Sequence, residues 1–436
     1  MKTKNILITF LLLFFWVHAT SQSLLPKLQQ IFGTENVVSA NSSVFNEYYY
    51  INVKQPIDHT DTNKGYFYQR IFLGHNNTQS PTLLETSGYQ IPPFVTIDTK
   101  LELTELLNAN QVYVEHRYFG KSVPDATNAY LTCKQASGDY HNIRQLLGKI
   151  YPNKWLSSGT SKGGYATLAY KYYYPNDVNA SFAYVAPFPL EKEDKRPETF
   201  LEEKRKTEVG KRIFEYQLYL LKNKKELMPV FDKMVKTAGM NTKPLTDTEI
   251  LYDYAVLEMD FTFWQNDPSI QNFERYINES YDYLVKEGFV TPIELNNFED
   301  KMVIYLLDCV HGFTDPNYTP HYYQAFSEMG YYGYNEKPFE KYLKQKDYAL
   351  EIFAQKTVTY NSDNAKAIKI FTETTIDKMI FIYGANDPWT ATSVTVPPKS
   401  DNLLLVHPTA NHSVEIGDFS AKEKEKIMER LNFWLK

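Results

Sequence analysis

Short apolar segments that alternate with helical patterns occupy the first part of the chain, from about residue 46 to residue 190. Runs of β-branched and aromatic residues predict strands at 48–53, 66–73, 81–85, 111–115, 155–158 and 182–185. Helical spacing occurs at 101–107, 164–174 and 139–150, where Asp139 is a predicted N-cap. The first two strands predict an antiparallel pair, and the later ones predict a parallel sheet with helices on both faces.

A different pattern begins near Phe188. Residues 190–357 are rich in charge and predict helices, for example at 202–225, 247–263 and 272–287. Strand patterns return at 379–383 and 403–406, and an amphipathic helix at 421–435 ends the chain. A sheet that stops and then resumes predicts one α/β core, at 22–189 and 358–436, with an inserted helical cap at 190–357.

The first residues have the three parts of a secretory signal peptide. Lys2 and Lys4 precede an apolar run at 6–17, and small polar residues follow at 19–22. The apolar run is much shorter than the roughly 20 residues needed to span a bilayer. We therefore predict a cleaved signal peptide at 1–21 and a soluble protein that is secreted or periplasmic.

Composition narrows the range of partners. Of the 436 residues, 43% are hydrophobic, which excludes a disordered chain, and the net charge of −6 comes without basic clusters. Neither nucleic acid nor an anionic membrane is therefore an expected partner. No Cys-x-x-Cys or His-Glu-x-x-His spacing occurs, so we predict no metal and no cofactor. Cys133 and Cys309 are either one disulfide or two buried thiols.

The clearest chemical signal is the sequence Gly-Thr-Ser-Lys-Gly-Gly at residues 159–164. It lies between a predicted strand and a predicted helix, which is the context of a Gly-x-Ser-x-Gly nucleophile elbow in an α/β-hydrolase core. A Cβ at either flanking glycine would clash where the strand turns back into the helix. The alternative is an ordinary strand–helix loop, which also favours Gly and Ser. We predict that Ser161 is a nucleophile.

A serine nucleophile needs a base and a carboxylate, which follow it in this fold in the order Asp or Glu, then His. Asp387 comes directly after the strand at 379–383, and His412 lies in the loop after the strand at 403–406. Both positions are at the carboxyl edge of the sheet, where Ser161 is also expected. His407 competes with His412, but it abuts its strand and has less reach.

Other residues near the predicted site have less specific roles. His116 and Asp139 would form a His–Asp–Ser order that belongs to a different fold, so we expect His116 to be a hydrogen-bonded residue beneath the site. Asp308 and Asp315 are expected to be solvated or structural. The predicted oxyanion donors are the amides of Lys162 and of Tyr89, in the loop after the strand at 81–85.

Several segments resemble the prolyl carboxypeptidase and dipeptidyl peptidase II family. They are Gln-Pro-Ile-Asp-His at 55–59, Phe-Tyr-Gln-Arg at 67–70, Glu-His-Arg-Tyr-Phe-Gly-Lys-Ser at 115–122, Tyr-Gln-Ala-Phe-Ser-Glu-Met-Gly-Tyr at 323–331 and Asn-Asp-Pro-Trp at 386–389. The elbow sequence and the small number of cysteines depart from that family. In both respects the chain resembles the related bacterial family of secreted prolyl tripeptidyl aminopeptidases.

This resemblance implies a serine exopeptidase that often cuts after proline, with Ser161, Asp387 and His412 at the triad positions. Peptides are then the expected substrates, and Glu328 is a candidate partner for their ammonium group or, alternatively, a structural acid. An esterase or lipase on the same core and a catalytically silent binding protein are the competing hypotheses. The sequence does not decide the length of the released fragment or the oligomeric state.

Overall fold

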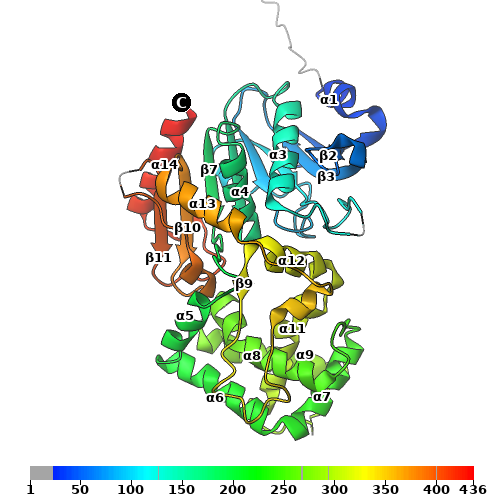
Figure 1. Ribbon diagram of the computed structural model, residues 1–436, viewed down its shortest axis with the longest axis vertical. Helices are drawn as coiled ribbons and strands as arrows, with labels where there is room; N and C mark the ends of the chain where they lie inside the picture. Colours follow the sequence, from blue (N-terminus) through cyan, green and yellow to red (C-terminus); the bar gives the residue numbers. More distant parts are fainter. Residues whose placement is uncertain (1–22, 126, 267–268, 293, 399) are drawn as a thin grey trace, which may run out of the picture.

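A computed structural model describes residues 23–436 except 126, 267–268, 293 and 399. The predicted signal peptide at 1–21 lies outside these residues. The described chain folds into a sheet with helices on both faces and a second, helical layer beneath one edge of the sheet (Figure 1). No helix in this part of the chain is long and apolar enough to cross a membrane.

The sheet of the described chain contains nine strands. Their spatial order is β1 (Val37–Ala40), β2 (Glu47–Pro56), β3 (Tyr66–His75), β5 (Asn110–Val114), β4 (Thr82–Thr86), β6 (Trp155–Thr160), β7 (Ala180–Tyr184), β10 (Met379–Gly384) and β11 (Leu403–His407). The first three strands are antiparallel to their neighbours, and the strands from β5 to β11 are parallel. This confirms the predicted antiparallel opening and the mostly parallel α/β sheet.

Helices cover both faces of the sheet, because its central strands are apolar on both sides. Every residue of β4, β5, β7 and β10 is buried. One face packs against α3 (Cys133–Leu147), α4 (Lys162–Tyr173) and α13 (Asp363–Thr374), and the other against α2 (Glu102–Leu106) and α14 (Ala421–Leu435). The short helix α1 (Leu25–Phe32) packs beside the antiparallel strands.

A layer of helices lies between β7 and β10 in the sequence and forms its own apolar core (Figure 1). It contains α5 (Arg196–Lys204), α6 (Glu208–Lys222), α7 (Lys224–Thr237), α8 (Thr248–Asn266), α9 (Ile270–Lys286), α10 (Phe298–Lys301), α11 (Leu306–Thr314) and α12 (Thr319–Gln324). The pair β8 (Glu193–Asp194) and β9 (Tyr331–Tyr332) joins the two ends of this layer, which we call the cap. The exact domain boundaries at 189/190 and 357/358 stay a prediction.

Two details differ from, or go beyond, the sequence analysis. Helix α3 begins at Cys133, with Thr132 as N-cap accepting a hydrogen bond from the amide of Gln135 at 3.2 Å. The prediction of Asp139 as N-cap was wrong, because the Thr-x-x-Gln sequence begins the helix earlier and Asp139 lies in its middle.

Cys133 and Cys309 are both buried free thiols, so they form no disulfide.

Candidate active site

Ser161 lies in a strained turn between β6 and α4. Its φ of 58° and ψ of −125° are rare for a residue with a side chain, and its amide donates to the carbonyl of Tyr184 at 2.9 Å. A Cβ on Gly159 would overlap the backbone of Gly163, and a Cβ on Gly163 would overlap the carbonyl of Thr86. The expectation that both glycines are sterically required is confirmed, and the turn has the geometry of a nucleophile elbow.

Asp387 and His412 form a direct pair at the same edge of the sheet. Asp387 follows β10, is fully buried, and accepts from His412 Nδ1 at 2.7 Å and from the amide of Trp389 at 3.0 Å. Because an ionised carboxylate only accepts, Nδ1 carries the proton and Nε2 keeps its lone pair. This is the tautomer that a general base requires.

Ser161 and His412 line one cavity of about 460 Å³. Its walls come from the sheet layer and from the cap, so it lies between the two. The sheet layer also contributes Lys162, Tyr89 and Trp389, and the cap contributes Glu258, Thr262 and Gln265 among others. His407 is not among the lining residues, and its Nδ1 accepts from the amide of Ala410 at 3.0 Å. The structure therefore brings His412, and not His407, to the cavity.

Lys162 and Tyr89, the two predicted oxyanion donors, both line this cavity, but their amides differ in their hydrogen-bond partners. The amide of Lys162 is at the N-terminus of α4, where the first amides of a helix have no partner within the helix. The loop of Tyr89 packs against this end, since a Cβ on Gly88 would lie 2.7 Å from the nitrogen of Gly163. The amide of Tyr89, however, donates to Ser87 Oγ at 3.1 Å. Its role as a donor to an oxyanion stays a prediction.

The side chain of Lys162 is a feature that the sequence analysis missed. Its Nζ donates to the carbonyl of Gly88 at 2.6 Å and lies 4.4 Å from the ring centre of Phe119 and 5.1 Å from that of Tyr89. Burial lowers the pKa of this ammonium to about 7. The side chain of Lys162 thus connects the start of α4 to the loop of Gly88. The sequence alone does not indicate this contact.

Glu328 does not lie where a partner for the substrate is needed. It belongs to a single π-helical turn, Ala325–Met329, and its carboxylate accepts from the amide of Cys133 at 2.6 Å and from Gln324 Nε2 at 3.1 Å. Met329 and Gly330 line the cavity, but Glu328 is not among the lining residues. The structure therefore favours the alternative interpretation, a structural acid that joins the cap to α3.

The two spare aspartates also have defined places. Asp315 caps a short 3-10 turn by accepting from the amide of Asn317 at 2.9 Å, which is a structural role. Asp308 accepts from the hydroxyl of Tyr276 at 2.7 Å but also lines the cavity. The buried carboxylate of the cavity is Glu258, which sequence reasoning missed because it lies in the cap, where no motif marks it.

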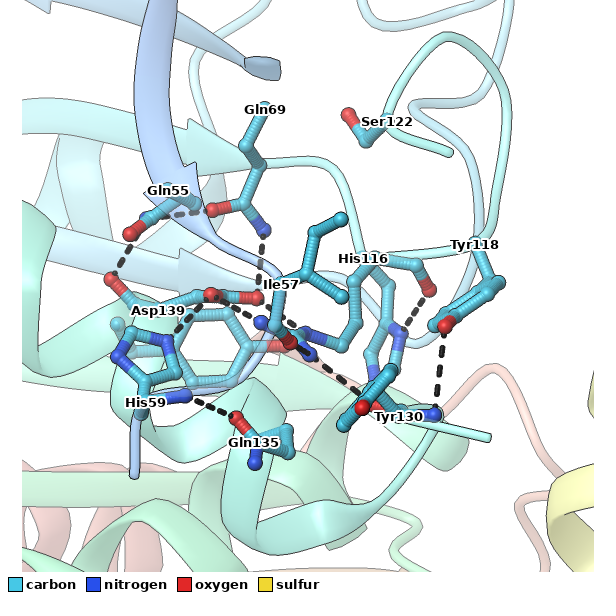
Figure 2. Close-up of polar contacts among 12 residues, drawn as sticks. Gln55, Ile57, His59, Gln69, His116, Tyr118, Ser122, Tyr130, Gln135 and Asp139 are labelled. Atoms are coloured by element: carbon cyan, nitrogen blue, oxygen red, sulfur yellow. Dashed lines mark hydrogen bonds and ion pairs between the residues drawn. The ribbon is translucent and has the colours of Figure 1, made fainter. Parts of the chain in front are cut away.

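Residues of the motifs at 55–59, 67–70 and 115–122 converge on Asp139 (Figure 2). Asp139 accepts from Arg117 Nε and Nη2 at 2.7 Å each and pairs with His59 Nε2 at 2.8 Å. Gln55 and Gln69 bond to each other at 2.8 Å, and Gln55 also donates to the carbonyl of Asp139 at 3.1 Å. These residues fasten α3 to β2 and β3, so their role is structural.

His116 lies beside this network but does not join Asp139. Its Nδ1 contacts the carbonyl of Arg117 at 2.8 Å (Figure 2). Burial and the nearby charge of Lys162 hold the pKa of His116 well below its usual value. The His–Asp–Ser arrangement of a different fold is therefore absent, because Asp139 is committed to Arg117 and His59.

The sheet order, the strained serine at the end of β6 and the inserted cap define the class of this protein as an α/β hydrolase. A profile of the PS-10 peptidase S37 family matches residues 27–436. The chain belongs to this family of serine peptidases.

Comparison with individual proteins gives weaker similarities. A prolyl tri/tetrapeptidyl aminopeptidase of Streptomyces mobaraensis is 27% identical over 401 residues, which are 89% of this chain and 80% of that protein. Among solved structures, VinJ is 12% identical with a TM-score of 0.41, and the alignment covers 88% of this chain and 97% of VinJ. The proline iminopeptidase of Mycobacterium smegmatis is 11% identical with a TM-score of 0.36, at coverages of 88% and 97%. Structural similarities at this level carry no argument about the reaction.

Proposed function

We propose that this chain is a secreted serine exopeptidase that releases tripeptides or dipeptides from free N-termini, with cleavage after proline. The observation that carries the proposal is the His412–Asp387 pair, which faces the same cavity as the strained Ser161. The name of the Streptomyces relative supports the choice of the N-terminus and of proline. The signal-like segment at 1–21 supports secretion.

The proposed mechanism uses the same three residues in both half-reactions. Ser161 Oγ attacks the carbonyl carbon, His412 Nε2 takes the hydroxyl proton, and Asp387 stabilises the imidazolium. The amide of Lys162 and that of Tyr89 stabilise the oxyanion. His412 then gives its proton to the leaving amine, and water, activated by the same imidazole, releases the peptide from the acyl-enzyme.

The first test is mass spectrometry of a peptide mixture with free and acetylated N-termini, incubated with the mature protein and with Ser161→Ala. We expect tripeptides or dipeptides to be released from free N-termini only, and no release by the variant. The variant with Ser39→Ala is a matched control, because Ser39 is an exposed serine of the edge strand β1.

Three other outcomes contradict the proposal. Cleavage inside blocked peptides would indicate an endopeptidase. Hydrolysis of short-chain esters without any peptide cleavage would favour the esterase or lipase hypothesis. Failure of Ser161 to react with an activated organophosphonate would indicate a catalytically silent binding protein.

A further inference from the structure

We propose that the carboxylate of Glu258 binds the free α-amino group of the peptide and thereby limits cleavage to the N-terminus. This inference rests on the proposed function, because it assigns a binding site within the same cavity. It replaces the role that the sequence suggested for Glu328.

Glu258 lies on the face of α8 that lines the cavity. Glu258, Thr262 and Gln265 all line it, and their spacing of four and seven residues places them on one side of the helix. At the end of this row, the carbonyl of Gln265 accepts from the amide of His412 at 3.1 Å. The row formed by Glu258, Thr262 and Gln265 therefore begins at Glu258 and ends beside the loop of His412, the proposed catalytic base.

The length of this row matches a short peptide. Seven residues of helix rise about 10 Å, which is the approximate distance along α8 from Glu258 to Gln265. An extended peptide advances about 3.3 Å per residue, so about three residues span the same length. A peptide whose amino group reached Glu258 would present about its third peptide bond near His412.

The carboxylate of Glu258 is buried and has no cationic partner. Only 7% of Glu258 is exposed, and its oxygens accept from the hydroxyls of Tyr332, at 2.8 and 3.0 Å, and Tyr334, at 2.6 Å. Glu258 takes part in none of the ion pairs among the described residues. The hydroxyl of Thr262 adds a longer contact to Oε1 at 3.5 Å. Three hydroxyl protons still leave an acceptor position of the carboxylate free, since a carboxylate offers about four.

The surroundings favour a positively charged ligand. Burial raises the pKa of Glu258 to about 8, and an ammonium group in the cavity would supply the missing opposite charge. Asp260 raises this pKa further, although its own carboxylate pairs with Arg205 at 2.7 Å. Aromatic rings also line this region, with Tyr332 and Trp389 5.3 Å apart, and their faces attract cations.

The other charged or titratable groups of the cavity do not offer an equivalent site. On α11, Asp308 is an exposed residue that bonds to Tyr276, and Cys309 and His311 lie beside it. From α12, His321 packs against Tyr89. Lys162 points its ammonium at the carbonyl of Gly88. Glu258 is therefore the cavity carboxylate that is both buried and without a cation.

The test compares Glu258→Gln with the unchanged protein on one tripeptide anilide ending in proline, with a free and with an acetylated N-terminus. Gln keeps an oxygen for the two tyrosine hydroxyls but removes the charge. We expect kcat/KM on the free peptide to fall about 100-fold, whereas any residual hydrolysis of the acetylated peptide should change less than about 3-fold. Glu258→Asp keeps the charge and should lose less on the free peptide than Glu258→Gln.

Controls separate this inference from the proposed function. Asp308→Asn and Glu328→Gln should retain the preference for a free N-terminus, and the rate of organophosphonate labelling of Ser161 should be unchanged in Glu258→Gln. Equal losses on both peptides in Glu258→Gln and Glu258→Asp would overturn the site while leaving the peptidase intact. Absence of cleavage and of labelling in the unchanged protein would instead overturn the proposed function.

Discussion

Lys162 is a buried residue, only 2% exposed, whose charge lowers the pKa of the neighbouring His116 and His321. Its pKa is about 7 in the folded protein against 10.5 for an exposed lysine. Between these values the unfolded chain holds one more proton than the folded chain. The free energy of unfolding therefore rises as the pH increases from 7 to 10.5. This gain is complete above pH 10.5, and it is lost as the pH falls through 7.

Replacing Lys162 by Met should remove this contribution. We expect the unfolding free energy of the original protein to rise relative to that of Lys162→Met between pH 7 and 9, by about 1 kcal/mol per pH unit. Urea unfolding at pH 6.5, 7.5 and 8.5 measures the difference. Lys154→Met, at a partly exposed position, is the control, and parallel profiles for Lys162→Met and the original protein would contradict the interpretation.

At the scale of elements, the pair of Arg117 and Asp139 fastens α3 to the antiparallel strands. Both side chains are fully buried, so removing Arg117 leaves the Asp139 carboxylate without two charge-assisted hydrogen bonds and with His59 as its remaining ion-pair partner. We expect Arg117→Met to lower the unfolding free energy by about 3–5 kcal/mol. Adding Asp139→Asn to Arg117→Met should recover part of this loss, which a double-mutant cycle by urea unfolding measures. A loss below about 1 kcal/mol for Arg117→Met would show that the pair contributes little.

The burial pattern of each helix and strand also determines which of its features can be predicted from the sequence. The strands from β2 to β7, with β10 and β11, and the positions of Ser161, Asp387 and His412 at the carboxyl edge of the sheet follow from local apolar runs and from the chain order of the fold. The edge strand β1 was not predicted, and the catalytic roles of the three residues stay a prediction. Glu258 could not be found in this way, because every residue from 251 to 264 of α8 is buried and no polar face marks the cavity. Asp139 was misplaced because its buried ion pair, a tertiary contact, overrides its preference for a helix end.

At the scale of the whole molecule, the sheet and the cap form two layers (Figure 1). Residues of both layers line the cavity, so a substrate must reach past the cap. We compare one scissile bond in two substrates, a free peptide and the N-terminus of a folded domain. When the bond lies directly before the folded domain, we expect it to be cut at least roughly tenfold more slowly than in the free peptide. The test substrate is a folded domain joined to the proline by a linker of three or of twelve residues. Mass spectrometry over time measures the rate at which the N-terminal peptide is released from each. Equal rates for both linkers would show that the cap does not restrict access.

The loops that follow β10 and β11 are bound to the cap as well as to the sheet. The amide of His412 donates to the carbonyl of Gln265 on α8, the indole of Trp389 donates to the side chain of Gln265 at 3.0 Å, and Lys204 donates to Asn386 at 2.5 Å. Ser161 is synthesised long before His412, so an unfinished chain carries a serine without a partner to activate it. The loop of His412 acquires its position by meeting both the end of β10, through Asp387, and the cap, through Gln265. On the proposed mechanism, the peptidase is therefore inactive during its own synthesis and becomes active only when the loop of His412 docks.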